Sequence, residues 1–366
     1  MTTPAVLFFD PANSPRALAV LTLLDRQVIA AHRAGCAPIT IVHEAPLPSL
    51  RRSAKLGIEV THATASPTLH CPTLLIQGNV LVHAADLRRL IAECGRLATP
   101  SRQPLPVGVA TSWAGSVSAS LAAQPSLIAA GVAHVIEDDL SFAQAEEALW
   151  DSMGSSSDGV VDRYFNRPVG RLFSKVLIHT PVTPNQVSVF ATLLGVAAAW
   201  LCLAGTHERL LLGAVLLQFS AVIDCVDGDI ARVLHKETPA GKWIDIVGDQ
   251  VVHLCLFLAL GFGLATRPEL ATTAKALGLV AAVGAVVSFA VVLRGMLRGG
   301  ASGRLQALVD KTTNRDFSVV LLALAIVDRV EWFLWMAAIG THCFWLLALW
   351  VQRSDEAAAA PPVSPA

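Results

Sequence analysis

Five aspartates fall within residues 224–249, in an otherwise apolar stretch of the chain. The segment reads DCVDGDIARVLHKETPAGKWIDIVGDQVV over residues 224–252, and its acids are Asp224, Asp227, Asp229, Asp245 and Asp249. Residues three or four apart share one face of a helix. Asp224 and Asp227 would thus share one face, and Asp245 and Asp249 another. Two adjacent helices would then direct four carboxylates at a common point.

Such a cluster predicts bound cations, because four carboxylates cannot all stay ionised in a site of low dielectric constant without them. Oxygen ligands without His or Cys select Mg²⁺, Mn²⁺ or Ca²⁺. A pair of such ions commonly clamps a reacting phosphate. The alternative, ion pairing inside a helix bundle, is disfavoured because carboxylates within membrane helices are rare and mostly functional.

Small and basic residues accompany the acids. Gly228 and Ala231 leave room on the helix surface for a ligand to approach the backbone. Arg232, one turn later, could donate two hydrogen bonds to a phosphate. Gly241 lets the chain turn before the second helix. Asp229 has no place in this arrangement, and we assign it no role.

The helices that would carry these residues begin near residue 185. The chain has 366 residues, is 54% hydrophobic and 15% charged, and has a mean hydropathy of +0.56. Apolar runs near the length of a membrane span occur only beyond that point. We expect an all-α bundle of six transmembrane helices within residues 183–353. The expected spans are 187–204, 209–231, 243–264, 273–293, 316–328 and 332–351, of which the fifth is short.

The loops between these spans differ in charge. Basic residues concentrate on the side of the N-terminal region: Arg232, Lys236, Lys242, Arg294, Arg298, Arg304, Lys311, Arg315 and Arg353. The opposite loops hold only Arg209, Arg267, Lys275 and Arg329. By the positive-inside rule, the N-terminal region and the acidic motif are cytoplasmic in a multi-pass protein of the inner cell membrane.

Residues 1–150 predict an α/β domain with a mostly parallel sheet. Short apolar runs at 5–10, 38–43, 73–78 and 106–110 have the pattern of buried strands, and helical patterns cover 17–35 and 84–97. A Ser-rich linker follows at 151–157. The opening residues lack the basic and apolar regions of a signal peptide. The seven cysteines are scattered and indicate reduced thiols.

A basic, aromatic helix is expected over 158–182, between the linker and the first span. Arg163, Arg167, Arg171 and Lys175 recur every four residues among Tyr164, Phe165, Leu172 and Phe173. This pattern is typical of a helix that lies at the membrane interface, although an ordinary solvated helix would share it. The last residues, 354–366, predict a disordered tail.

The acidic segment resembles the signature of the CDP-alcohol phosphotransferases. The pattern Asp224-x-x-Asp227-Gly228-x-x-Ala231-Arg232, then eight residues, then Gly241-x-x-x-Asp245-x-x-x-Asp249 matches it at every position. The resemblance implies a six-helix membrane enzyme in which an acceptor hydroxyl displaces CMP from a CDP-linked alcohol, with two Mg²⁺ or Mn²⁺ ions. It further implies that Asp224, Asp227, Asp245 and Asp249 bind metal, that Asp249 is also the candidate base, and that Gly228, Ala231, Arg232 and Gly241 hold the CDP moiety.

The resemblance covers about residues 158–351 and extends to one branch of the family. In that branch, which includes bifunctional inositol-phosphate cytidylyltransferase and di-inositol-phosphate phosphate synthase, a nucleotidyltransferase precedes the membrane enzyme. Here the first strand runs into DPANSPRAL, with no glycine before Gly35 and no lysine before Lys55. Asn79 stands where a metal-binding acid is expected, and Asp138 and Asp139 are weak substitutes. We therefore predict a degenerate nucleotidyltransferase-like domain that is inactive in cytidylyl transfer.

Other functions stay open. The domain could still make its own CDP-alcohol, and the aspartates could line the path of a divalent-cation transporter, although no second acidic motif suggests the repeated halves of a transporter. An inactive membrane anchor is a further alternative that the complete motif disfavours. Four basic residues could bind an anionic acceptor, although topology or lipid headgroups explain them equally well: Arg294, Arg298, Lys311 and Arg315.

The expected partners follow from these readings. They are a CDP-alcohol of the CDP-diacylglycerol or CDP-inositol type, a hydroxyl acceptor that is a polyol, a polyol phosphate or a lipid, and membrane lipids. The pattern also allows a homodimer. The net charge of −1 gives no indication of a nucleic-acid partner.

Overall fold

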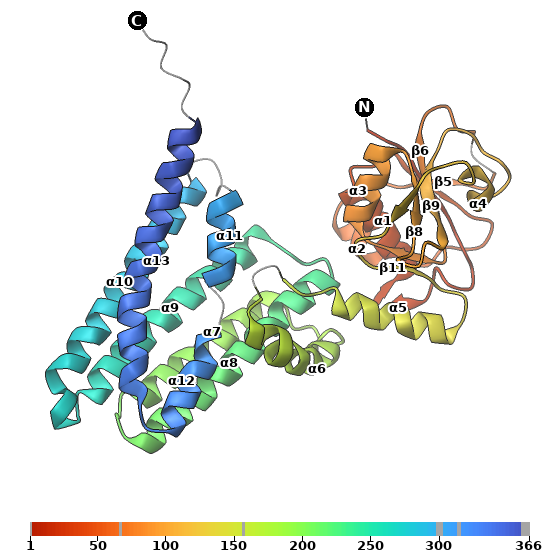
Figure 1. The fold of residues 1–366 in the computed structure, drawn as a ribbon. Helices are drawn as coiled ribbons and strands as arrows, with labels where there is room; N and C mark the ends of the chain where they lie inside the picture. Colours follow the sequence, from red (N-terminus) through yellow and green to blue (C-terminus); the bar gives the residue numbers. More distant parts are fainter. Residues whose placement is uncertain (1, 66–67, 156–157, 298–302, 313–315, 360–366) are drawn as a thin grey trace, which may run out of the picture. The chain divides into compact units, whose positions relative to one another are not determined.

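The computed structural model describes residues 2–65, 68–155, 158–297, 303–312 and 316–359 (Figure 1). Backbone contacts divide the chain into two compact units. One comprises Met1–Met153 with Val233–His235, and the other comprises Gly154–Arg232 with Lys236–Ala366. The first is an α/β unit and the second is entirely helical, in the order that the sequence predicts.

A seven-stranded sheet with the order β10-β8-β9-β6-β1-β4-β5 forms the centre of the first unit. Its strands are β1 (Ala5–Phe8), β4 (Ile39–Val42), β5 (Thr61–Ala63), β6 (Thr73–Gln77), β8 (Arg96–Ala98), β9 (Pro104–Ala110) and β10 (Ser126–Ile128). The pairs β1–β4, β1–β6, β4–β5 and β8–β10 are parallel, whereas β9 runs antiparallel to β6 and β8. The sheet is thus mostly parallel, as expected.

Short helices and two small ribbons complete this unit. The helices are α1 (Leu23–Arg33), α2 (Arg51–Lys55), α3 (Ala84–Glu93), α4 (Val117–Ser120) and α5 (Asp139–Asp151). β7 (Val80–Val82) pairs with β11 (Ala133–Val135), and β2 (Ala17–Leu18) pairs with β3 (Leu21–Thr22). The buried apolar residues of the strands, such as Leu7, Ile41 and Leu74, pack with those of α1 and α3. Burial of these side chains stabilises the unit.

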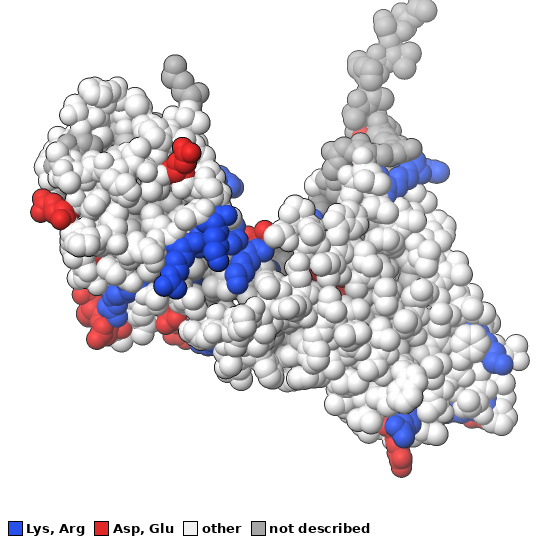
Figure 2. Space-filling model, turned by 180° about the vertical axis from the view of Figure 1, so that it is seen from behind, with Lys and Arg blue, Asp and Glu red and all other residues white. Residues whose placement is uncertain are grey.

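Within its described residues, the helical unit contains five helices that are long and apolar enough to cross a membrane. They are α7 (Pro184–Cys202), α8 (His207–Val233), α9 (Pro239–Leu264), α10 (Ala271–Leu297) and α13 (Val330–Ala359). Shorter helical segments are a π-helix (Asp162–Asn166), α6 (Arg167–Leu177), a 3₁₀ turn (Pro268–Leu270), α11 (Gly303–Thr312) and α12 (Phe317–Ile326). Charged side chains are sparse over the visible face of this unit, as Figure 2 shows. These features identify a membrane protein.

Glycines allow α7 and α9 to pack closely. A Cβ atom at Gly195 of α7 would lie 2.6 Å from the side chain of Val252 on α9. A Cβ atom at Gly248 of α9 would overlap the hydroxyl of Thr192 on α7. Small residues at a helix crossing let the backbones approach, and this contact holds α9 against α7.

The structure differs from the sequence expectations at three places. Residues 17–22 form the β2–β3 hairpin, and α1 begins only after the N-cap Thr22, whose side chain accepts from the Asp25 N–H. α12 has 10 residues, about 15 Å of helix, too short to cross a hydrocarbon core alone. α13 continues to Ala359, past the start of the predicted tail, because alanine strongly favours helix; the remaining tail lies outside the described residues.

Candidate metal centre

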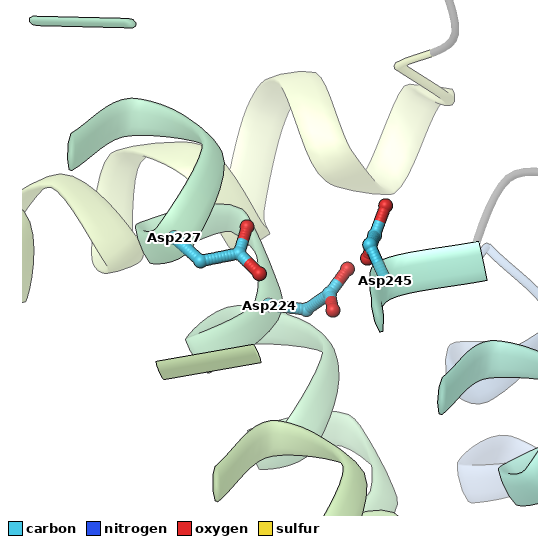
Figure 3. A group of neighbouring side chains, drawn as sticks. All are labelled: Asp224, Asp227 and Asp245. Carbon is cyan, nitrogen blue, oxygen red and sulfur yellow. The ribbon is translucent and has the colours of Figure 1, made fainter. Parts of the chain in front are cut away.

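Three of the motif aspartates form one cluster. Asp224 and Asp227 lie one turn apart on α8, and Asp245 lies on the first turns of α9. One carboxylate oxygen of each lies within 4.8 Å of the others, and all three side chains are half-buried. Figure 3 shows the three carboxylates turned toward one region between the two helices. Three of the four motif carboxylates thus lie close together, and their role as metal ligands stays a prediction.

The chain turns sharply between the two helices to bring them together. Thr238 is the N-cap of α9, and its hydroxyl accepts from the Gly241 N–H at 3.0 Å. A Cβ atom at Gly241 would lie 2.8 Å from Oδ1 of Asn185, at the start of α7. Gly241 therefore permits the close approach of α7 to this turn. α7 also reaches the cluster itself, because the Ser188 hydroxyl donates to the Asp227 carboxylate.

The cluster has the composition of a site for a hard divalent cation. Three carboxylates from two rigid helices offer oxygen ligands only, and no His or Cys belongs to the group among the described residues. Oxygen donors of this kind suit Mg²⁺, Mn²⁺ or Ca²⁺ and suit Zn²⁺ poorly. Asp224, Asp227 and Asp245 thus fit the metal ions that the sequence predicts.

Asp249 lies outside this group of three. It follows Asp245 by one turn of α9 and borders a small cavity of about 10 Å³. His253, Phe317 and Ser318 also line this cavity, so the start of α12 reaches the level of Asp249. The roles of Asp249 as a fourth ligand and as a base stay predictions.

Asp229, to which the sequence assigned no role, is a buried centre of ion pairing. Its Oδ1 accepts from Arg167 at 2.8 Å and from Arg232 at 3.2 Å, and the Ser174 hydroxyl lies 3.4 Å from Oδ2. Arg167 also pairs with Asp158. The side chains of Asp229 and Arg167 are only 2% and 11% exposed. Through these contacts, Asp229 of α8 holds α6 against α8.

Arg232 is already engaged in this network, although the sequence places it at the CDP moiety. Its guanidinium lies close to Gly228, where an added Cβ atom would approach Nη2 to 2.9 Å. Gly228 and Ala231 are half-buried on α8. Arg232 lies 28% exposed, so it keeps a solvent-accessible edge while Asp229 orients it.

The segment before α7 turns a polar stripe inward and apolar side chains outward. Asn166 accepts from Gln218 of α8 at 2.6 Å, and Gln218 accepts from the Ser318 hydroxyl of α12 at 2.7 Å. Asp316 accepts from the N–H groups of Val160 and Val161, which begin the helical stretch. Large exposed apolar side chains lie on the other face, namely Val160, Tyr164, Phe165, Leu172, Phe173 and Val176.

The four basic residues suggested for acceptor binding are only partly described. Arg294 lies exposed near the end of α10. Lys311 lies on α11, but its side chain is outside the described part, as are residues Arg298 and Arg315 altogether. Acceptor binding by this group stays a prediction.

We expect Asp229→Asn to destabilise the helical unit by about 3 kcal/mol, because removal of one member of a buried pair leaves charge without compensation. Thermal unfolding in detergent would measure the change. Asp328→Asn is the matched control: Asp328 pairs with Arg267 at 2.6 Å but is 45% exposed, and such pairs contribute less than about 1 kcal/mol. Equal losses in the two variants would contradict a central role of Asp229.

Comparison with known proteins shows which family the helical part of the chain resembles. Residues 181–351 match the family model of the CDP-alcohol phosphatidyltransferases. The bifunctional IPC transferase and DIPP synthase of Rubrobacter xylanophilus is 30% identical over 198 residues, which are 53% of this chain and 44% of that protein. The phosphatidylinositol phosphate synthase of Corynebacterium glutamicum is 29% identical over 174 residues, 46% of this chain and 76% of that protein.

The matches have clear limits. The chain spans less than half the length of the bifunctional relatives that it matches. A crystal structure of Mycobacterium tuberculosis phosphatidylinositol phosphate synthase with CDP-DAG bound matches 50% of this chain and 94% of its own, with 20% sequence identity and a TM-score of 0.37.

Proposed function

We propose, from the CDP-alcohol phosphatidyltransferase domain that residues 181–351 form, that this chain is an integral membrane CDP-alcohol phosphotransferase. The reaction transfers a substituted phosphate. The hydroxyl oxygen of an acceptor alcohol bonds to the phosphorus that carries the donor's alcohol, the bond from that phosphorus to CMP breaks, and the hydroxyl proton passes to a base. The observation that carries this proposal is the convergence of Asp224, Asp227 and Asp245 between α8 and α9.

Asp224, Asp227 and Asp245, with Asp249 as a fourth ligand, would hold two Mg²⁺ or Mn²⁺ ions. When bound, such ions neutralise charge that develops on a reacting phosphate. Asp249 is also our candidate base for the acceptor hydroxyl, because it lies one turn beyond Asp245. Its position beside His253 and Ser318 supports a role next to the cluster.

The CDP moiety would lie along α8 beside the cluster. Gly228 and Ala231 have small or no side chains, so a ligand could approach the backbone of α8 there. Gly241 would allow the same approach at the turn before α9. Arg232 would donate to a phosphate oxygen from the position in which Asp229 holds it. Asp229 is in this proposal a positioning residue.

Two donor types and several acceptors are compatible with this site. We propose a CDP-diacylglycerol or CDP-inositol donor and a polyol, polyol phosphate or lipid acceptor, as in the synthesis of phospholipids or polyol phosphodiesters. Mass spectrometry of the products tests this directly: the purified protein and Mg²⁺ receive each donor with a panel of polyols and polyol phosphates. Formation of CMP and one phosphodiester identifies the pair, whereas no CMP from any pair contradicts the function.

We further propose six spans in the inner cell membrane, with the front domain and the acidic cluster on the cytoplasmic side. α12 is too short to cross alone and would be the sixth, short segment of the bundle, partly buried by its neighbours; the cavity that Phe317 and Ser318 share with Asp249 supports this. The segment 158–182 would lie at the membrane interface, because its exposed side chains are large and apolar. The protein would contact membrane lipids and could act as a homodimer.

The first unit is, in this proposal, a nucleotidyltransferase-like domain without cytidylyl-transfer activity. The loop after β1 is closed on itself, because the Asp10 carboxylate accepts from the Ala12 N–H and from the Asn13 amide, each at 2.9 Å. A phosphate would have to displace this carboxylate from its donors. Two acids considered as metal ligands are also engaged: Asp138 caps α5, and Asp139 pairs with Arg16.

Deletion of residues 1–150 is expected to leave CMP release from a supplied CDP-alcohol within about twofold of the full chain, because all proposed chemistry lies on α8 and α9. Radiometric CMP release from equal amounts of folded protein would measure this. A loss of more than tenfold in correctly folded protein would show that the front domain takes part in the transfer.

The alternative that the front domain also catalyses cytidylyl transfer is tested by pyrophosphate release. The full chain with CTP and a polyol phosphate is expected to release no pyrophosphate above background. Sustained pyrophosphate release that disappears on deletion of residues 1–150 would establish a second activity in the front domain.

A further inference from the structure

The front domain contains a pocket of about 600 Å³ at the carboxyl ends of its central parallel strands. Residues at the ends of β1, β4 and β6 line it, including Phe8, His43 and Gln77. β4 and β5 lie on one side of β1, and the chain then crosses to β6 on its other side, so the strand order reverses at β1. Open α/β sheets bind ligands at such switch points, and the volume is typical of ligand sites.

The pocket is chemically unsuited to a phosphate. No lysine or arginine occurs among the described residues that line it. The loop after β1 contributes Pro11 to the wall, and its Ala12 N–H is already bonded to the Asp10 carboxylate. An anionic ligand would therefore meet negative charge and no free cluster of amides.

Two polar side chains of the pocket, His43 and Glu44, offer acceptors, whereas Thr64, Gln77 and Ser116 can donate or accept. Nδ1 of His43 lies 3.0 Å from the carbonyl oxygen of Ala45. A carbonyl oxygen can only accept, so Nδ1 is the donor in this contact, and Nε2 is an acceptor whenever the ring carries a single proton. Glu44 adds an exposed carboxylate to the same wall, and within the described part of the chain no lysine or arginine forms an ion pair with it. The ligand should therefore bring donors and positive charge.

Aromatic rings form another part of the wall. The rings of Phe8 and Trp113 stack with their centroids 4.8 Å apart and an interplanar angle of 11°. Ring faces carry negative partial charge and attract cations, most strongly for tryptophan. A carboxylate beside stacked rings is complementary to an amine.

We propose that this pocket binds a small organic cation, an amine or a quaternary ammonium compound, between the Glu44 carboxylate and the Phe8–Trp113 ring pair. This site is independent of the acidic cluster in the helical unit and of the transfer reaction proposed for it. It gives the front domain a binding role in place of the cytidylyl transfer that its closed loop disfavours.

Isothermal titration calorimetry of the full-length protein in neutral detergent, with EDTA and low salt, tests the proposal. The probes are choline and putrescine, with 3,3-dimethylbutanol as the uncharged counterpart of choline, and CMP and a polyol as rival classes. We expect saturable binding of at least one cation, and none of the uncharged counterpart.

Two variants locate the binding. Glu44→Gln should weaken the affinity for the cation about tenfold, because one partly exposed charge is lost. Trp113→Leu should weaken it roughly threefold to thirtyfold. Glu59→Gln removes an exposed carboxylate elsewhere in the same unit and should change the affinity less than about twofold.

The outcomes separate clearly. Cation binding that both variants weaken, in protein with unchanged thermal unfolding, supports the site. Cation binding that both variants leave unchanged would place the site elsewhere and overturn the proposal. Binding of CMP or the polyol alone, or of no probe, would overturn it equally.

Discussion

Asp227→Asn and Asp245→Asn are each expected to lower the rate of CMP release at least about a hundredfold while the protein stays folded in detergent. Each substitution removes one negative ligand from a cluster of three carboxylates. Changes outside a metal's ligands already lower affinity or activity 10–100-fold in typical sites, so loss of a ligand should do at least as much. Initial rates at saturating donor, acceptor and Mg²⁺ would measure the loss.

Asp328→Asn is the control for this pair of variants. It makes the same chemical change at an exposed aspartate of the helical unit that lies outside the cluster. We expect its rate to stay within about twofold of the unsubstituted protein. Turnover close to normal in Asp227→Asn or Asp245→Asn at saturating Mg²⁺ would refute the assignment of these acids as metal ligands.

Removal of divalent ions is expected to have an effect of similar size. Treatment with EDTA should lower CMP release at least about a hundredfold, and added Mg²⁺ or Mn²⁺ should restore it, because the proposed chemistry depends on cations held by the carboxylates. Zn²⁺ should restore little, because the cluster offers oxygen ligands only. Rates of CMP release measured across a titration of each metal chloride would show how well Mg²⁺, Mn²⁺ and Zn²⁺ restore activity.

Thermal unfolding with and without EDTA controls for a general loss of structure. Repulsion among the three carboxylates should make the metal-free protein somewhat less stable, with its fold retained at assay temperature. Activity that resists the chelator would mean that the aspartates serve a purpose other than binding metal.

The central features of the candidate metal centre follow from local sequence. Asp224 and Asp227 meet because three residues make nearly one helical turn, and this spacing holds wherever α8 lies. Hydropathy places α7, α8, α9 and α10 within about four residues of their observed bounds and α13 at its start but not at its end, because a membrane span must be both long and apolar. The four main strands of the front domain are visible for a similar reason, as short apolar runs between turns.

Tertiary structure decided which distant residues became partners. Asp229 and Arg167 are 62 positions apart, and nothing in either neighbourhood indicates that they pair; the packing of the preceding segment against α8 creates the contact. Asp249 shares a helix with Asp245, yet it borders the separate cavity at the start of α12. The absence of glycines from the loop after β1 is visible in the sequence, but only the folded structure shows the Asp10 carboxylate accepting from the Ala12 N–H and the Asn13 side-chain amide. The periodicity of a helix or strand is set by residues that are near one another in the sequence. A buried ion pair or a closed loop depends instead on how whole elements pack, and the residues that determine this packing are spread over the chain.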